Sequence, residues 1–497
     1  MDDGGIALTG VPGAANSLDE GRDNAVPKPP PVDVDEIDPA IEKRLRRKLD
    51  RRVVGVLFLL YLVAFLDRSN IGNAQTAGMG KDLGFDDEQF QWLLTIFYIP
   101  YILFEWLAIM WKLVPPHIWA SVTVLIWGLA STLQAVAFNW QGLMACRAFL
   151  ALAEAGFGPG VPYLLSFFYR RHELGLRCGL FLSAAPLATA FAGALAYAIT
   201  STATPLPSWR LLFLAEGLPA VLLSLAAFYL LPDSPDTASF LIPAERHAAR
   251  ARAVLQAGRP GVARLGSFAW PDALAALRAP HTWLQPLMFF SCNVSFSSLP
   301  VFLPSVLSHM GFSAASAQGL TAPPYLLAFV VCIATTYLAD RTRQRAAVIG
   351  VLSLVGAVGY IVLATAEGVG TRYAALFLTA AGVFPAIANI LPWVLNNQGT
   401  DAKRGLGIAM LNVVGQCGPL LGTRMFPARE APYYRRGMVV CAGFMGFNAV
   451  LAGVLRVYFV RENRMIERGE GGRAAEVGEE AVGGSEMEGA LGYRFVL

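Results

Sequence analysis

Charged residues are scarce in this chain. Asp, Glu, Lys and Arg make up 15% of its 497 residues, whereas hydrophobic residues make up 55%. A soluble domain carries about 25% charged residues, so the composition excludes an ordinary soluble protein. It indicates a protein that crosses the membrane several times. The net charge of +3 decides little, because in such a protein the position of the charges matters more than their sum.

Metal-ligand and catalytic patterns are also lacking. The six cysteines nearly all lie in apolar stretches and form no CxxC pair, and the five histidines fall at the ends of these stretches or in loops. The cysteines therefore read as small buried hydrophobes, not as disulfides or metal ligands. No nucleophile–base set or phosphate loop lies in or beside the apolar stretches, so an enzyme is the least favoured class. We expect no metal, no cofactor and no nucleic-acid partner.

Long apolar runs dominate what is present. A cleavable signal peptide is not visible, and about twelve segments of roughly 18–25 residues are each long enough to cross about 30 Å of hydrocarbon. The approximate limits of these segments are 53–75, 90–111, 118–138, 142–168, 178–200, 210–231, 283–307, 318–340, 346–366, 372–395, 405–425 and 437–460. The sequence therefore predicts an all-α membrane protein, with twelve transmembrane helices in two six-helix bundles and a monomeric state.

The longest loop between these segments divides the chain into six plus six, which suggests two similar bundles facing one another. The loop contains a basic helical stretch, Glu245 to Gln256. The predicted organisation is a disordered tail at 1–52, a first bundle at 53–231, a central loop at 232–282, a second bundle at 283–460 and a second tail at 461–497.

Basic residues gather on one side of this arrangement. They precede the first segment, from Lys43 to Arg52, and recur in the loops that face the same side. By the positive-inside rule both termini and the central loop are cytoplasmic, and we expect the plasma membrane. The last loop on the other side is an exception to the rule, because it carries Arg424, Arg429, Arg435 and Arg436.

Four charges lie inside the predicted spans of the first half. Arg147 and Glu154 are seven residues apart, so they share one face of a helix. At about 1.5 Å per residue, Asp67 lies about 21 Å into the first span, level with Arg147. Glu154 lies about 10 Å deeper than Arg147, near the centre of the bilayer. Because charges in a span are costly, we expect Asp67, Arg68, Arg147 and Glu154 to line one cavity.

The chemistry of this set suggests coupling to protons. Two arginines and two carboxylates sum to zero, and protonation of the carboxylates would leave a positive site that attracts an organic anion. A proton and an anion entering together restore neutrality, which is a physical basis for symport. The alternative is a static ion pair between Asp67 and Arg147 that holds two helices together.

Other polar residues are candidates of lower rank. Tyr101 could offer its hydroxyl to a ligand, although a tyrosine in a span more often packs or lies at an interface. In the second half Asn389, Trp393 and Asn396 recur on one helical face, so amides and an indole could bind a neutral part of the ligand. Their alternative role is hydrogen bonding between helices. Glu105 and Glu216 are better explained as structural partners of loop arginines.

Nine stretches in order along the chain resemble the major facilitator superfamily, and within it the anion:cation symporters of the allantoate permease type. They are LDRSNIGNA (66–74), FYIPYILFE (97–105), RAFLALAEAGFGPGVPYLLSFFYRR (147–171), FLAEGLPAV (213–221), LPDSPDTASFL (231–241), TAPPYLLAF (321–329), LADRTRQR (338–345), NILPWVLNNQG (389–399) and FPAREAPYYRRG (426–437). The resemblance implies alternating access and proton-coupled uptake of small carboxylates or related anions.

The resemblance also implies roles for single residues. It assigns proton coupling to Asp67 and Glu154, and substrate binding to Arg68, Arg147 and Tyr101. It further assigns gating to the loop after the eighth helix, with Asp340, Arg341 and Arg345. The segment after Glu105 and the loop KLVPPHIW (112–119) depart from the family pattern.

Two other functions remain open. A drug:proton antiporter is disfavoured because the fifth segment, SAAPLATAFAGA (183–194), keeps only Pro186 and Gly193 of the glycine-rich signature of that class. A nutrient sensor that does not transport is usually expected to bear a long structured tail, and the tails here are short. The expected partners are therefore a small organic anion, protons and the lipid bilayer.

Overall fold

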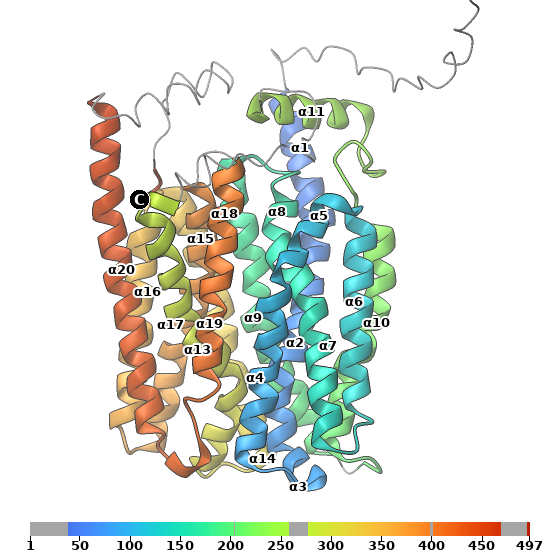
Figure 1. Ribbon diagram of the computed structural model, residues 1–497, viewed down its shortest axis with the longest axis vertical. Coiled ribbons are helices and arrows are strands. Elements are labelled where there is room, and N and C mark those ends of the chain that lie inside the picture. Colours follow the sequence, from blue (N-terminus) through green and yellow to red (C-terminus); the bar gives the residue numbers. More distant parts are fainter. Residues whose placement is uncertain (1–37, 203, 258–276, 398–400, 469–494) are drawn as a thin grey trace, which may run out of the picture.

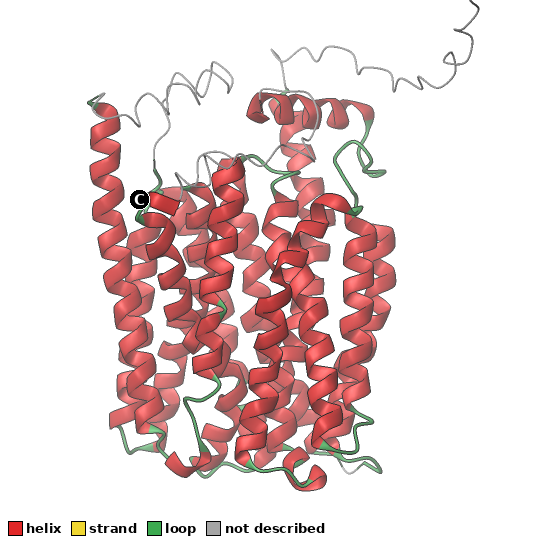
Figure 2. Ribbon diagram, viewed as in Figure 1, coloured by secondary structure: helices red, strands yellow, loops and turns green. Residues whose placement is uncertain are grey.

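A computed structural model of the chain describes residues 38–202, 204–257, 277–397, 401–468 and 495–497. Within these ranges the chain forms helices joined by loops, with no strand (Figure 2). Ten helices are long and apolar enough to cross a membrane. The 22-residue helix α2 (Gly55–Thr76) and the shorter apolar segment Gly407–Gly422 complete the predicted set of twelve.

The first six spans run from α2 to α10 (Figure 1). The elements are α1 (Pro39–Leu49), α2 (Gly55–Thr76), α3 (Met79–Leu83), α4 (Asp87–Phe104), α5 (Met110–Leu113), α6 (Pro116–Gln134), α7 (Trp140–Phe157), α8 (Val161–Leu165), α9 (Arg171–Thr200) and α10 (Ser208–Leu230). Three of the spans are followed by short helices, because α3 follows α2, α5 follows α4 and α8 follows α7.

The second six spans run from α13 to α20 and follow α11 (Pro243–Ala257), which confirms the predicted helix of the central loop. The elements are α13 (His281–His309), α14 (Ala314–Gly319), α15 (Ala322–Thr342), α16 (Arg345–Thr365), α17 (Val369–Asn396), α18 (Asp401–Gly415), α19 (Cys417–Gly422) and α20 (Arg435–Glu467). The eleventh span is thus broken at Gln416, between α18 and α19.

Each half packs as a bundle. In the first, α6 packs against α7 and α10, and α4 packs against α7; in the second, α16 packs against α17 and α20. The bundles meet where α9 contacts α15 and α17, and where α2 contacts α13. Gly72 makes the second contact possible, because a Cβ there would lie 2.2 Å from the carbonyl oxygen of Val301. Only a glycine lets the two backbones approach so closely.

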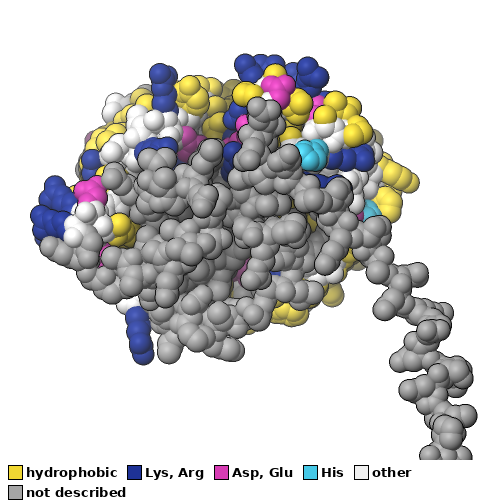
Figure 3. Space-filling view, turned by 90° about the horizontal axis from the view of Figure 1, so that it is seen from above, with side chains coloured by type: hydrophobic (Ala, Val, Ile, Leu, Met, Phe, Trp, Pro, Cys, Tyr) yellow, Lys and Arg dark blue, Asp and Glu magenta, His cyan; other side chains and the backbone are white. Residues whose placement is uncertain are grey.

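One end of the molecule carries α1 and α11, and we call it the basic end (Figure 1). Figure 3, which views this end, shows Lys and Arg side chains at several places along its rim. The exposed basic residues of α1 and the turn after it include Lys43, Arg44, Arg47, Arg51 and Arg52. The other end, which carries α3 and α14, is called the opposite end.

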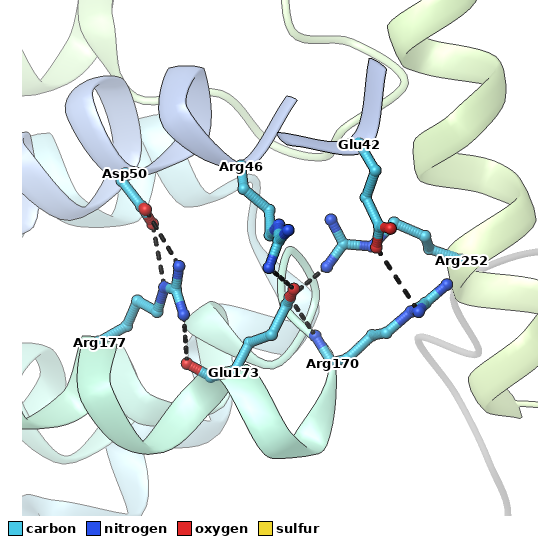
Figure 4. Close-up of polar contacts among 7 residues, drawn as sticks. All are labelled: Glu42, Arg46, Asp50, Arg170, Glu173, Arg177 and Arg252. Carbon is cyan, nitrogen blue, oxygen red and sulfur yellow. Dashed lines mark hydrogen bonds and ion pairs between the residues drawn. The ribbon is translucent and has the colours of Figure 1, made fainter. Parts of the chain in front are cut away.

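Paired charges hold α1 and α11 against the first bundle (Figure 4). The guanidinium of Arg177 donates two hydrogen bonds of 3.0 Å to the carboxylate of Asp50. Buried Glu173 accepts from Arg252 of α11 and lies 3.5 Å from Arg46 of α1. Burial lowers the pKa of Arg252, and the neighbouring carboxylate of Glu173 opposes that shift. The network therefore fixes three segments from distant parts of the sequence.

The structure corrects the predicted tails in part. Residues 39–49 form a helix, although the sequence assigned 1–52 to a disordered tail, because Leu45 and Leu49 are buried and the inner charges are paired. Helix α20 likewise continues to Glu467, beyond the predicted end of the second bundle at 460. The remaining tail residues, 1–37 and 469–494, lie outside the described ranges.

Candidate functional site

Arg68 of α2 and Glu154 of α7 form a direct ion pair. The Arg68 Nε lies 2.5 Å from Glu154 Oε2, with Glu154 1% exposed and Arg68 15% exposed. The Arg68 guanidinium also lies over the rings of Phe97 and Tyr101, 5.1 and 4.8 Å from their centroids. Arg68 is thus held by one carboxylate and two aromatic faces, an arrangement that orients a cation for a ligand.

Asp67, the next residue along α2, faces a different helix. Its Oδ1 accepts a hydrogen bond of 2.5 Å from the hydroxyl of Ser131 on α6. Its Oδ2 is buried and has no hydrogen-bond partner among the described residues. A carboxyl group with one free oxygen in a dry setting is a place where a proton can bind and leave.

Arg147 of α7 lies beside Asp67 but bonds its backbone. The Arg147 Nη1 donates to the carbonyl oxygen of Asp67 over 3.4 Å, and its guanidinium lies 5.1 Å from the centroid of Phe97. No ion pair joins the Asp67 and Arg147 side chains among the described residues. The predicted common depth of these two residues is therefore confirmed, whereas the static pair between their side chains does not form.

A cavity of about 860 Å³ lies between the two bundles. The first bundle contributes Arg68 and three tyrosines, Tyr61, Tyr98 and Tyr101. The second contributes polar residues and aromatic rings, namely Asn293, Asn412, Gln416, Phe289 and Phe296. A smaller cavity of about 290 Å³ adjoins it, because Arg68, Tyr98, Ser297 and Val301 line both, and Arg147 lines the smaller one.

The four charges therefore do not line one cavity as predicted. Arg68 lines both cavities and Arg147 lines the smaller one, whereas Asp67 and Glu154 lie behind them and line neither. The carboxylates are nearly fully buried, at 1% exposure each, and their contacts are with Ser131 of α6 for Asp67 and with Arg68 of α2 for Glu154. The position of a residue along its helix predicts its depth in the bilayer, but it does not predict the direction in which its side chain points.

The candidates of the second half lie elsewhere. Asn389, Trp393 and Asn396 are buried in α17 and line neither cavity. Asn389 accepts from Arg345 over 3.4 Å and donates to the carbonyl oxygen of Pro385, which is the interhelical and local bonding of the alternative interpretation. The indole of Trp393 donates to the carbonyl oxygen of Val496 over 2.7 Å. These three positions therefore lie away from both cavities in this structure.

Two of the three gating candidates lie between the bundles. Arg345, 1% exposed, pairs with Asp340, and both side chains press on α9, because a Cβ on Gly175 would lie 2.3 Å from Arg345 Nη2. Arg341 is exposed. The Asp340–Arg345 pair therefore lies against α9 at the boundary between the two bundles.

Contacts between the bundles close the opposite end. Arg424 donates to Gln91 over 3.3 Å and lies over the ring of Trp92, 4.8 Å from its centroid. Thr95 and Thr423 share a hydrogen bond of 3.2 Å, and Gln318 donates to the carbonyl oxygen of Asn73 over 3.1 Å. Arg424, one of the four arginines that break the positive-inside pattern, thus has a local role in joining the bundles.

Some residues of the site had only a weak signal in the sequence. Asn293 and Asn412 line the large cavity, as do Tyr61 and Gln416. Isolated amides and tyrosines in apolar spans are the signal that could have found them. Glu105 and Glu216 are buried, and none of their carboxylate oxygens has a hydrogen-bond partner among the described residues. The predicted pairing of these glutamates with loop arginines is therefore wrong.

Two helical bundles with a cavity between them are an arrangement that many secondary transporters share. The family model of the Major Facilitator Superfamily matches residues 57–423. The chain is 34% identical over 458 residues to the "MFS transporter prlL" of Fungal sp. (strain NRRL 50135), covering 90% of this chain and 92% of that one. This chain belongs to the Major Facilitator Superfamily.

More distant comparisons agree on the fold. The chain is 27% identical to the "High-affinity nicotinic acid transporter" of Saccharomyces cerevisiae, over 85% of this chain and 79% of that one. A solved bacterial homolog of the human lysosomal transporter Spinster, inward-facing and occupied, superposes with a TM-score of 0.60 at 16% identity. That superposition covers 82% of this chain and 97% of the Spinster homolog.

Proposed function

We propose that this protein is a proton-coupled symporter that imports a small organic anion by alternating access. The observation that carries the proposal is the placement of Arg68 and Arg147 on adjoining cavities, with the carboxyl groups of Asp67 and Glu154 directly behind them. The cations face the space that a ligand can enter, and the proton acceptors are shielded from it.

The proposed cycle follows from charge balance. With both carboxylates ionised, the four side chains are neutral together, and Glu154 competes with any anion for Arg68. A proton on Glu154 releases the Arg68 guanidinium, which then binds the carboxylate of the substrate. Release of this proton on the other side of the membrane restores the ion pair between Glu154 and Arg68, which expels the anion.

The lining of the large cavity narrows the substrate class. Seven aromatic side chains surround it, so a flat or apolar part of the ligand packs well beside the single guanidinium. Among similar proteins one is named for nicotinic acid, an aromatic carboxylate. We therefore propose a small carboxylate with a ring or other apolar part, and keep allantoate and related ureides as candidates.

Orientation and location complete the proposal. The basic end is cytoplasmic by the positive-inside rule, so both termini are cytoplasmic and the closed opposite end faces outward. The large cavity is lined by Gly158 and Pro162 at the end of the fourth span and by Leu391 near the end of α17, all toward the basic end, as expected for an inward-facing state. We propose a monomer in the plasma membrane.

The test is uptake by the purified chain in liposomes with an imposed proton gradient. Labelled nicotinate, allantoate, pantothenate and biotin are offered with and without a protonophore. We expect accumulation of one of them when the outside is acidic, and its loss with the protonophore. Accumulation driven by an acidic interior would instead indicate a drug:proton antiporter. Tight binding of an anion without movement across the bilayer would indicate a sensor.

A further inference from the structure

The last three residues of the chain are seated on the second bundle. Phe495, Val496 and Leu497 pack against the hydrophobic core, at the basic end beside α20 (Figure 1). They touch residues of three helices that are far apart in the sequence: His281 of α13, Trp393 and the residue after α17, and the end of α20. Contacts with side chains from three separate helices indicate a specific binding position for this segment.

Two asparagine side chains hold the backbone of this segment. Asn463 of α20 donates to the carbonyl oxygen of Phe495 over 3.0 Å and accepts from its N–H over 2.8 Å. Asn397 treats Val496 in the same way, donating over 3.0 Å and accepting over 2.7 Å. A side-chain amide that both donates to and accepts from the backbone of one residue makes the two hydrogen bonds that a neighbouring β-strand would make to an extended peptide.

A buried tryptophan and an aromatic pocket complete the seat. The Trp393 indole donates to the carbonyl oxygen of Val496, which therefore accepts from Trp393 and Asn397 together. The ring of Phe495 stacks on Phe459, with centroids 5.0 Å apart and planes 16° apart, and lies 6.0 Å from the ring of His281. The backbone contacts give affinity without regard to sequence, whereas the aromatic pocket selects the side chain at position 495.

We propose that these residues form a binding site for an extended, apolar peptide segment, occupied here by Phe495, Val496 and Leu497 of the same chain. The bound segment clips together the ends of α13, α17 and α20 at the basic end. This inference does not depend on the proposed substrate or on proton coupling, because none of its residues lines either cavity.

Peptide binding to the full-length chain tests the site. The probe is a fluorescent peptide of residues 493–497, Tyr-Arg-Phe-Val-Leu, followed by fluorescence anisotropy. The substitution Phe495→Asp in the chain removes its own aromatic anchor and vacates the site. We expect the probe to bind this variant at least about tenfold more tightly than the wild-type chain, whose site is occupied. A probe carrying Phe495→Ala should lose most of that binding.

Further variants locate the binding. Adding Asn397→Ala and Asn463→Ala to the Phe495→Asp chain should abolish the gain, whereas Arg461→Ala, on the exposed face of the same helix, should leave it unchanged. Equal weak binding of the probe to all variants, each monodisperse in detergent, would overturn the proposal.

The melting temperature of variants tests the same site without an added peptide, and it also reveals whether a variant is misfolded. In the otherwise unchanged chain, Phe495→Ala and Asn463→Ala should each lower the melting temperature. The double variant should lower it by clearly less than the sum, since both remove the same contact. Strictly additive shifts would contradict the proposed site.

Discussion

At the scale of single residues, the central feature is that two arginines line the cavities while two carboxyl groups are enclosed behind them. Arg68 and Arg147 line cavities, whereas Glu154 and Asp67 are each only 1% exposed. The sequence predicted which residues belong together, because charges in apolar spans are rare and their depths match. It could not predict that Arg147 bonds the backbone of Asp67, since that depends on side-chain direction.

The two arginines should therefore be needed for uptake. A charge-assisted hydrogen bond to an anion contributes about 1.5–3 kcal/mol, so Arg68→Ala and Arg147→Ala should each lower the apparent affinity by about tenfold or more. The measurement is uptake of the identified anion, with membrane abundance determined in parallel. Arg44→Ala, an exposed position on α1, is the control and should transport normally. Normal accumulation in either site variant would count against the site.

Glu154 should carry the coupling proton. In Glu154→Gln an amide oxygen can still accept from Arg68, so the fold is retained, but the charge that a proton would neutralise is gone. We expect uptake that no longer responds to a proton gradient, while exchange of labelled for unlabelled anion continues. The measurement is initial uptake rate against external pH. A pH profile identical to that of the wild-type chain would remove Glu154 from the proton route.

At the scale of the helix, the basic end is held together by ion pairs that no sequence pattern predicts. The sequence predicted the helix within α11, but not that Arg252 on it reaches Glu173 of α9, 79 positions earlier. It also assigned α1 to a disordered tail, although Ile41, Leu45 and Leu49 recur every fourth residue and give this short charged helix one apolar face. The burial of Leu45 and Leu49 and the network in Figure 4 stabilise α1 instead.

Glu173 is the residue on which that network depends. The substitution Glu173→Gln leaves Arg252, 4% exposed, with Glu42, 3.6 Å away, as its remaining carboxylate partner, and breaking a buried pair costs about 3–5 kcal/mol. We expect a lower melting temperature and faster proteolysis within α11. The control is Asp236→Asn, which breaks an exposed pair with Arg250 and should cost about 1 kcal/mol or less. Equal changes in melting temperature for the two substitutions would show that the buried pair of Glu173 stabilises the protein no more than an exposed pair does.

At the scale of the whole molecule, the twelve spans and the two bundles could be predicted because hydropathy and length decide them. The contacts between bundles could not, since they depend on single close approaches. Gly72 against Val301 is the clearest example, and nothing in the sequence distinguishes this glycine from others in the spans. The same holds for α17, whose amides recur on one face yet do not reach the cavities.

Gly72→Ala should open the opposite end. Its Cβ would meet the backbone of Val301, which cannot rotate away, and overpacking of this kind costs about 1–3 kcal/mol. We expect α2 and α13 to separate, so that a reporter Thr95→Cys reacts faster with a membrane-impermeant maleimide. Gly443→Ala on α20, where a Cβ would meet nothing within 4 Å, is the matched control. An unchanged labelling rate in the Gly72 variant would show that this contact does not close the molecule.

The one-sided placement of charge has an electrical consequence. All four intramembrane charges of the site belong to α2 and α7 of the first bundle, and the second bundle faces them with amides, hydroxyls and rings. Rocking the second bundle past the first therefore displaces no fixed charge of the site across the membrane field. Under the proposed symport, any current carried by this protein would report only the difference between the number of protons and the negative charge of the anion that they accompany.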